Sequence, residues 1–221
     1  MHTAANLARA GDRLVSMFAA ALILLMLLFG GYSLWDTAMV FRGAFLDSDL
    51  LQFKPAAGDP DSNPTLEELQ AINPDVLGWL TIDGTHIDYP VVIDETDMEY
   101  VNKDVYGEFS LSGSIFLDSD NARDISNAYT LVYGHHMDNG GMFGDVVEFV
   151  NTDYFENHTT GTLYLPDATY TISLFACVEV DAFDSMIYDP LAQPEGDVSE
   201  LLHYVDEIAV QSRYIGVTPQ D

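Results

Sequence analysis

The sequence predicts a mostly β domain, a barrel or a sandwich with a few inserted helices, preceded by one transmembrane helix. Two observations support this fold class. A long uncharged segment occupies residues 14–35, and beyond it short apolar runs alternate with turn residues such as Asp83-Gly84 and Pro166-Asp167. We therefore expect a cytoplasmic N-terminus (residues 1–13), a transmembrane helix (14–35), a juxtamembrane segment with a linker (36–64) and one folded domain (65–221).

The uncharged segment is long enough to cross a bilayer. A helix rises 1.5 Å per residue, so residues 14–35 span a hydrocarbon core of roughly 30 Å. Arg9 and Arg13 precede it and Asp36 follows it, which places the N-terminus in the cytoplasm and the rest of the chain outside the cell. A cleaved signal peptide is disfavoured, because its apolar region would be shorter and no small-x-small site follows Trp35. We expect a single-pass anchor in the cell membrane.

The chain is strongly acidic. It contains 36 Asp and Glu residues against 7 Lys and Arg residues, a net charge of −29, and all these carboxylates except Asp12 lie beyond the membrane segment. This charge excludes nucleic acid as a partner, because binding needs Lys and Arg to displace counterions from phosphates. The single cysteine, Cys177, excludes an intrachain disulfide.

The remaining elements follow from local patterns. A linker is expected at residues 56–64, and a short helix at 66–72, because Thr65 and Glu68 match a capping box and Pro74 ends the helix. Apolar runs bounded by turn residues predict the strands, at residues 77–82, 85–92, 114–117, 129–135, 161–165 and 170–180. Helical spacing of apolar residues predicts two further helices, at residues 142–150 and 198–214.

The first candidate for a functional site is the stretch YTLVYGHHMDNGGMF, residues 129–143. It is typical of a strand that ends at His135 and His136, in front of a turn with Gly140 and Gly141. A histidine between a rigid strand and a flexible loop is well placed for proton transfer, although a polar strand end is the simpler alternative. Zinc is disfavoured, because adjacent histidines on a strand point to opposite faces and no other histidine has ligand spacing.

Two other candidates are disfavoured as well. The acidic residues 118–124 invite a calcium site, but Arg123 stands where an EF-hand loop needs glycine and the twelfth position carries no Glu. Cys177 could act as a thiol nucleophile, yet it lies in a long apolar run with Glu179 on the same face, and that carboxylate would raise its pKa. A small buried residue is the better interpretation of Cys177. No metal and no cofactor is implied.

Three segments together resemble the class B sortases. They are NPDVLGWLTIDGTHIDYPVV (residues 73–92), GSIFLD (113–118) and TLVYGHHMDNGGMF (130–143), in the family's order and at similar spacing, and the match extends over residues 66–213. The resemblance implies a sortase-type β-barrel and a membrane-anchored cysteine transpeptidase of a Gram-positive surface. It implies that His135, which follows Gly134 as in the family's YGH motif, is the catalytic residue that gives a proton to the leaving amine and pairs with the thiolate.

The resemblance also implies the partners. They are secreted proteins with a C-terminal sorting signal, which the enzyme cleaves after Thr, and an amine of a peptidoglycan precursor or of a pilin, which receives the acyl group. Family members carry the nucleophile in a T-L-x-T-C strand and an Arg on the following strand, and neither motif occurs before Asp221. Arg213 precedes that point, and Cys177 lacks the preceding Thr.

We therefore expect a truncated sequence, with a barrel that lacks its last strands and with no transpeptidase activity as it stands. A reading frame that continues past codon 221 into T-L-x-T-C would support this expectation. Two alternatives stay open. One is a non-catalytic, membrane-anchored interaction domain on a sortase scaffold, and the other is an enzyme that uses Cys177.

Overall fold

The computed structural model describes residues 2–44, 49–56, 62–193 and 196–216. The chain divides into two units, Met1–Arg42 and Gly43–Asp221. Most of the linker predicted at residues 56–64 lies outside the described residues.

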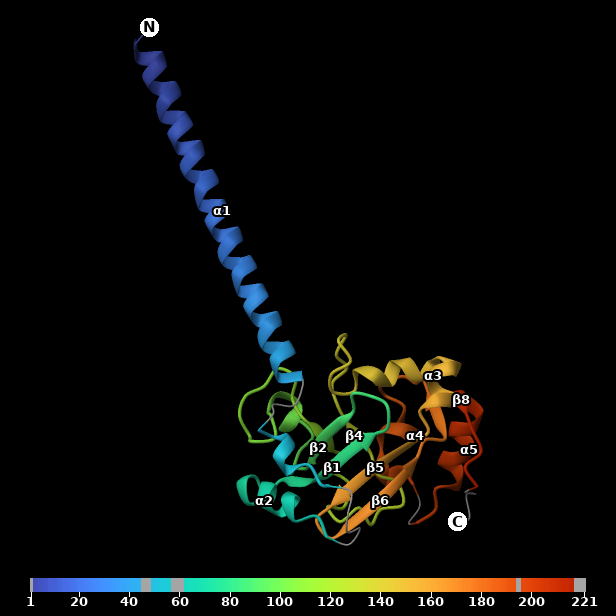
Figure 1. Cartoon of the computed structure of the whole chain (residues 1–221). Helices are drawn as coiled ribbons and strands as arrows, with labels where there is room; N and C mark the ends of the chain where they lie inside the picture. Colours follow the sequence, from blue (N-terminus) through green and yellow to red (C-terminus); the bar gives the residue numbers. More distant parts are fainter. Residues whose placement is uncertain (1, 45–48, 57–61, 194–195, 217–221) are drawn as a thin grey trace. The chain divides into compact units, whose positions relative to one another are not determined.

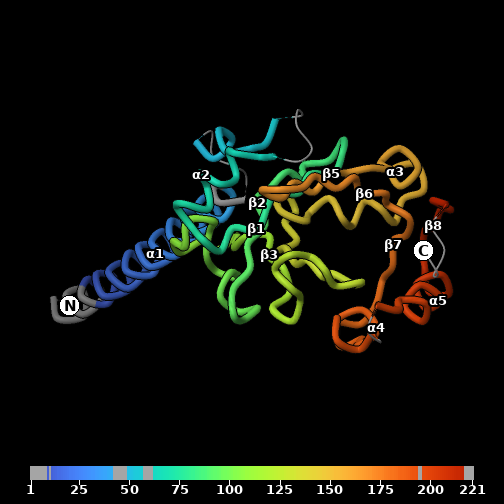
Figure 2. Tube along the Cα trace, turned by 90° about the horizontal axis from the view of Figure 1, so that it is seen from below, coloured from blue at the N-terminus to red at the C-terminus, as the bar shows by residue number. Residues whose placement is uncertain are grey.

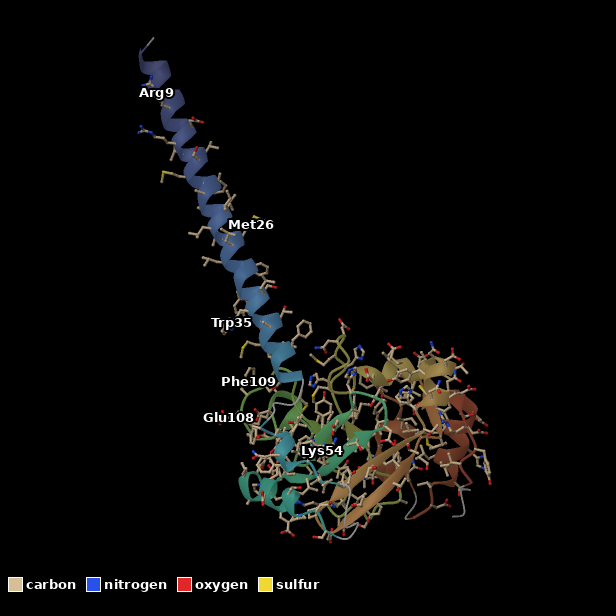
Figure 3. All side chains as sticks on the ribbon, viewed as in Figure 1. Arg9, Met26, Trp35, Lys54, Glu108 and Phe109 are labelled. Atoms are coloured by element: carbon tan, nitrogen blue, oxygen red, sulfur yellow. The ribbon has the colours of Figure 1, made fainter. Side chains whose placement is uncertain are left out.

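The described residues of the first unit lie within one helix, α1 (His2–Ala44), which contains the predicted residues 14–35 (Figure 1). Within the described residues, only the stretch Gly11–Phe41 is long and apolar enough to cross a membrane, and its most apolar window has a mean hydropathy of 2.5. Its apolar side chains, among them Met26 and Trp35, are exposed (Figure 3). By length and composition, this surface suits contact with lipid chains.

The second unit contains two β-sheets with inserted helices (Figures 1 and 2). The larger sheet has the order β4-β3-β2-β1-β5-β6, and β7 pairs with β8 in the smaller one. Only β2 and β3 are parallel among these pairs. The strands are β1 (Val76–Ile82), β2 (Asp88–Val92), β3 (Ile115–Leu117), β4 (Val132–Tyr133), β5 (Thr160–Leu165), β6 (Ala168–Ser173), β7 (Ala176–Val178) and β8 (Ala209–Ser212). The α-helices are α2 (Pro64–Ile72), α3 (Thr152–Asn157), α4 (Ser185–Tyr188) and α5 (Ser199–Ile208), and the 3₁₀ helices are η1 (Leu51–Phe53), η2 (Tyr100–Asn102), η3 (Gly144–Val150) and η4 (Pro190–Ala192).

Strand alternation divides the core into two clusters, one on each face of the large sheet. Val92 and Phe116 belong to the first cluster, which η1 and α2 cover. Their neighbours along the strands, Val91 and Ile115, belong to the second cluster. Met142 also belongs to the second cluster, so the loop that follows the candidate histidine packs directly on the sheet.

Residues that precede α2 are also bound to the sheet. Trp79 of β1 is fully buried, and its Nε1 donates to Asp88 Oδ1 at 2.7 Å. The other oxygen of Asp88 accepts from Lys54 Nζ at 2.6 Å (Lys54 is labelled in Figure 3). Further along, Asn63 Nδ2 donates to the Leu165 carbonyl at 2.6 Å, and the Asn63 amide donates to the Pro166 carbonyl at 2.9 Å. The residues that precede α2 are therefore attached to the sheet at two points, Lys54 and Asn63.

The structure corrects the predicted start of the first short helix. Helix α2 begins at Pro64, with Asn63 before it, and Asn63 uses its side chain for the β5–β6 turn instead of a cap. The capping box of Thr65 and Glu68 does not form, and Thr65 Oγ1 is buried without a hydrogen-bond partner. Proline at the first helical position sets the helical φ and needs no donor, which explains the earlier start.

Three other predicted elements differ from the observed structure. The predicted strand at 170–180 is two strands in different sheets, because β6 ends at Ser173 and β7 pairs with β8. The predicted helix at 198–214 ends at Ile208, and residues 209–212 become β8, whose Gln211 lies opposite Cys177. Unpaired backbone groups of β7 need partners, and this requirement outweighs the helical pattern. The predicted helix at 142–150 is the 3₁₀ helix η3.

Candidate functional site

His135 lies just beyond β4, at one edge of the large sheet. The predicted strand at 129–135 is regular only at Val132–Tyr133, where Tyr133 lies opposite Phe116. Before β4, Asn121 Oδ1 accepts from the Leu131 amide and Asn121 Nδ2 donates to the Tyr129 carbonyl, both at 2.8 Å, while the Leu131 carbonyl accepts from the Asp118 amide at 2.9 Å. A side-chain amide thus supplements the main-chain pairing at this point.

A buried carboxyl group supports β4 next to His135. Asp118, at the end of β3, is 3% exposed, and its Oδ2 accepts from the Tyr133 hydroxyl at 3.0 Å while Oδ1 accepts from the Asp120 amide at 2.9 Å. Burial raises the pKa of Asp118. Burial and the adjacent Asp118 also raise the pKa of Tyr133. The acidic loop at 118–124 is therefore bonded to its own backbone and to β4.

Asp118→Asn is expected to change how stability depends on pH. Because the folded-state pKa of Asp118 is raised, its favourable contribution is present below the unfolded pKa and is lost as the pH rises through the folded pKa. The free energy of unfolding of the variant, relative to the parent chain, should therefore rise from acidic to neutral pH, as measured by urea titration. Asp124→Asn should shift this difference in the opposite direction, because hydrogen bonds with Ser126 lower the pKa of exposed Asp124. A pH-independent difference for Asp118→Asn would contradict the raised pKa.

The loop after His135 is closed by main-chain contacts. His136 and Met142 form an antiparallel bridge, and the Phe143 amide donates to the His135 carbonyl at 2.9 Å. At its tip, the Gly140 amide donates to the Met137 carbonyl at 2.9 Å. The contact with Phe143 thus fixes the backbone of His135, and the bridge between His136 and Met142 closes the loop next to it.

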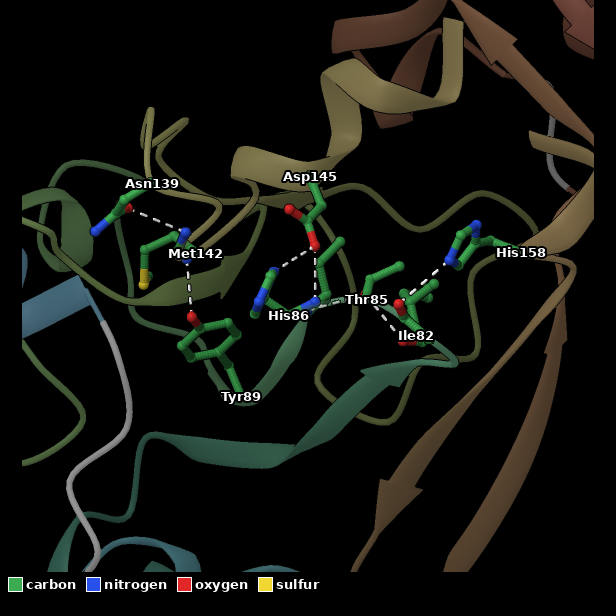
Figure 4. Close-up of polar contacts among 11 residues, drawn as sticks. Ile82, Thr85, His86, Tyr89, Asn139, Met142, Asp145 and His158 are labelled. Atoms are coloured by element: carbon green, nitrogen blue, oxygen red, sulfur yellow. Dashed lines mark hydrogen bonds and ion pairs between the residues drawn. The ribbon is translucent and has the colours of Figure 1, made fainter. Parts of the chain in front are cut away.

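Side chains around the β1–β2 hairpin hold this loop from below (Figure 4). The Tyr89 hydroxyl accepts from the Met142 amide at 2.9 Å. Asp145 Oδ2, in η3, is 2.7 Å from the backbone nitrogen of His86 and 2.9 Å from its Nδ1. Sequence reasoning predicted neither the contact of Tyr89 with Met142 nor that of Asp145 with His86, since the partners lie 53 and 59 positions apart and no short motif joins them.

The two adjacent histidines differ in their environments. His135 is half-buried, and none of the hydrogen bonds and ion pairs found among the described residues involves its imidazole. His136 is exposed, and its Nε2 lies 3.5 Å from the exposed carboxylate of Asp138. In the described part of the chain no group of three His, Cys, Asp or Glu side chains could hold a metal ion. The imidazole of His135 is therefore available to an incoming group.

The segment around α4 packs beside β4. The Tyr129 hydroxyl donates to the Ile187 carbonyl at 2.8 Å, and burial raises the pKa of Tyr129 to about 12. The rings of Tyr133 and Tyr188 stack with centroids 6.4 Å apart. Between Tyr129, β7 and α5 lies an apolar cavity of about 350 Å³, lined by Ala128, Tyr129, Phe175, Ala176, Val178, Ile187, Val198, Leu201, Leu202 and Val205.

Cys177 lies in β7, away from this cavity lining. Ala176 and Val178 line the cavity, so strand alternation directs Cys177 to the opposite face. Burial, with a smaller contribution from Glu179, raises the pKa of the thiol. Among the described residues no strand pair, hydrogen bond or ion pair joins Cys177 to His135. The structure does not bring these two candidate residues together.

Alkylation of Cys177 by iodoacetamide at pH 7 is expected to be slow in the folded chain. The thiolate is the reactive form, and the raised pKa lowers the fraction of Cys177 that is thiolate at pH 7. Partial burial also limits access of the reagent to the sulfur. Mass spectrometry should show a rate at least about ten-fold below that of the chain unfolded in guanidinium chloride. Equal rates in the two states would show an accessible, activated thiol and would support an enzyme that uses Cys177.

Arg213 has a structural role at the end of β8. Its amide donates to the Phe175 carbonyl at 2.7 Å, its guanidinium donates to the Phe155 carbonyl, and Cζ lies 3.9 Å above the ring of Phe155. These contacts join β7, β8 and α3. They leave Arg213 no direct contact with His135 among the interactions of the described residues.

Comparison with known proteins identifies related sequences. The chain is 31% identical to the sortase B of Listeria monocytogenes over 157 residues, which are 71% of this chain and 63% of that protein. It is 28% identical to the sortase B of Staphylococcus aureus over 158 residues, which are 72% of this chain and 64% of that protein. The chain thus spans less than two thirds of the length of these curated relatives. No protein-family profile matches it.

Solved structures of related proteins have the same architecture. A Streptococcus pyogenes class B sortase involved in pilus biogenesis is 41% identical, with a TM-score of 0.63 over 69% of this chain and 82% of that one. Sortase B from the type II pilus of Streptococcus pneumoniae is 37% identical, with a TM-score of 0.58 over 70% and 83%. A Staphylococcus aureus sortase B–substrate complex is 27% identical, with a TM-score of 0.66 over 73% and 74%.

Proposed function

Because this chain belongs to the class B sortases, a family of cysteine transpeptidases, we propose that it provides the scaffold and the catalytic histidine of a sortase that attaches proteins to the cell surface. The observation that carries this proposal is the position of His135. It follows β4 at a sheet edge, its backbone is fixed by Phe143, and its half-buried imidazole has no partner among the interactions of the described residues. That is the arrangement a proton donor needs.

In the proposed reaction His135 moves one proton. A thiolate attacks the Thr carbonyl of a sorting signal, the Thr–amide C–N bond breaks, and the protonated His135 gives its proton to the leaving amine. An acceptor amine then attacks the thioester and gives up one proton to the now neutral His135, the C–S bond breaks with the thiolate leaving, and the acyl group ends in a new amide. The identities of 41% and 37% to sortases of pilus systems support a pilin amine as the acceptor.

The proposal assigns the nucleophile to a cysteine outside these 221 residues. Cys177 is the single cysteine of the sequence, its thiol pKa is raised, and it faces away from the cavity beside β4. The same observation supports a second candidate function, a non-catalytic interaction domain on the sortase scaffold. The two candidates differ in whether any longer form of the protein transfers peptides.

The proposal places the enzyme at the cell membrane. Residues 14–35, within the stretch Gly11–Phe41, act as a single-pass anchor, with Arg9 and Arg13 on the cytoplasmic side and the second unit outside the cell. The substrates are secreted proteins with a C-terminal sorting signal, which reach the outer surface of the same membrane. The acidic charge of the second unit supports solubility there and excludes nucleic acid.

A transfer assay tests the proposal. A sorting-signal peptide and an amine acceptor are incubated with the 221-residue chain and with a longer form that carries a T-L-x-T-C segment. The longer form should give the peptide–amine product, and the 221-residue chain should give none. Absence of product from the longer form would favour the interaction domain, whereas product from the 221-residue chain that is lost in Cys177→Ser would assign the reaction to Cys177.

A further inference from the structure

Met142 has a backbone conformation that its surroundings must maintain. Its φ is 52°, in the left-handed region that residues other than glycine rarely adopt, and Ile125 is the only other such residue in the described chain. Met142 is also 2% exposed, within the second core cluster. Strained backbone of this kind persists where neighbouring groups fix it, and it is concentrated at functional sites.

The group that fixes Met142 is the hydroxyl of Tyr89. This oxygen accepts from the Met142 amide at 2.9 Å, and Tyr89 is 5% exposed in β2, a central strand of the large sheet (Figure 4). Burial raises the pKa of Tyr89, so the hydroxyl stays neutral at physiological pH. The contact is therefore a buried hydrogen bond to a rigid element.

A short path of backbone contacts leads from Met142 to His135. Met142 pairs with His136, and the next amide, that of Phe143, donates to the His135 carbonyl. If the Met142 backbone relaxed from its left-handed conformation, the Phe143 amide would change direction, since these two residues are adjacent. The hydrogen bond that fixes the His135 backbone would then weaken.

The tip of the loop lies close to a second group of side chains. Gly140 has a φ of 81°, and a Cβ placed there would lie 2.8 Å from Asp145 Oδ1 and 3.1 Å from His86 Nδ1. The tip therefore lies directly against the His86–Asp145 pair, which itself joins the β1–β2 hairpin to η3 (Figure 4). The hairpin thus contacts the loop at two separate points.

We propose that Tyr89 is a positioning residue for His135: its hydroxyl holds the loop at 136–142 in the strained conformation that directs the imidazole, and the His86–Asp145 pair supports the loop tip. The inference rests on the proposed catalytic role of His135. It places a specific determinant of His135 geometry on β2, a strand that carries none of the reacting groups.

Tyr89→Phe in the full chain tests the role of the hydroxyl. Hydrogen exchange of the Met142 amide, followed by NMR in detergent micelles, should become about ten-fold faster, because its acceptor is removed. Reaction of His135 with diethyl pyrocarbonate, followed by mass spectrometry, should change at least two-fold, while that of exposed His203 stays constant. The matched control is Tyr100→Phe, which removes a buried hydroxyl bonded to Asn73 and Asp75 in the first core cluster.

Gly140→Ala gives an independent test if Tyr89→Phe does not fold. The added Cβ would displace the loop tip, whereas Gly107→Ala, at a φ of 80° with nothing within 4 Å of its Cβ, introduces a similar backbone strain without a clash. His135 reactivity should change in Gly140→Ala and not in Gly107→Ala. Unchanged Met142 exchange and His135 reactivity in Tyr89→Phe, or equal changes in Tyr100→Phe, would overturn the proposal, as would unchanged His135 reactivity in Gly140→Ala.

These measurements need no transfer activity. A failed transfer assay would remove the catalytic role of His135 and leave the exchange and reactivity results intact. Conversely, normal transfer together with unchanged exchange in Tyr89→Phe would remove the positioning role alone.

Discussion

His135→Ala is expected to lower kcat/KM for transfer of a sorting-signal peptide by about 10²- to 10⁴-fold, which is the range that a positioned proton donor contributes. The leaving amine is a poor leaving group unless it is protonated, and His135 is the group proposed to protonate it. The rate is measured by chromatography of the peptide–amine product, in a form of the protein that supplies the reactive cysteine.

His136→Ala is the matched control for this variant. It removes an identical side chain one position further along, where the imidazole is exposed and faces the Asp138 carboxylate at 3.5 Å. Its kcat/KM should stay close to that of the parent. Comparable losses in the two variants would mean that the loop as a whole, and not the imidazole of His135, was responsible.

Gly78→Ala is expected to lower the free energy of unfolding by about 3 kcal/mol, the upper part of the usual range for overpacking. Gly78 lies in β1, next to the register shift in the β1–β2 pairing. A Cβ there would lie 2.2 Å from the Tyr164 carbonyl oxygen and 2.9 Å from Leu165 Cδ2. The carbonyl belongs to the backbone of β5, so β1 and β5 would have to separate. The shift of the urea midpoint at constant slope measures the loss.

Gly107→Ala is the control for Gly78→Ala. It should cost only about 1 kcal/mol, because its φ of 80° is unfavourable for alanine while no atom lies within 4 Å of the new Cβ. Equal losses at the two positions would show that β1 and β5 accommodate the methyl group by moving apart, and that their close approach is not required.

The sequence was sufficient for features that depend on neighbouring residues. The β1–β2 hairpin follows from Asp83-Gly84 between two apolar runs, and the structure has its turn there. The end of β4 near His135 was predicted for the same reason, since glycine and polar residues follow a short apolar run. The predicted end of this strand, at His135, therefore lies two residues beyond the observed end of β4.

Features that depend on distant residues were not predictable. The helix predicted at 198–214 ends before Ala209, where β8 begins, because the edge of β7 supplies backbone pairing partners that a helical pattern cannot reveal. The strand predicted at 170–180 bends near Phe175 for the same kind of reason. The contact of Tyr89 with Met142 joins positions 53 residues apart, and a tyrosine in an apolar strand is typical of any core.

The attachment of the residues before α2 determines which fragments of this protein can stand alone. Leu50 and Phe53 are 6% and 8% exposed in the first core cluster, and Asn63 supplies hydrogen bonds to the β5–β6 turn. A recombinant fragment that starts at residue 65 would leave Leu66, Leu69 and Trp79 partly open to water. One that starts at Gly43 keeps the covering residues, and proteolysis that trims the N-terminus should therefore stop before Leu50.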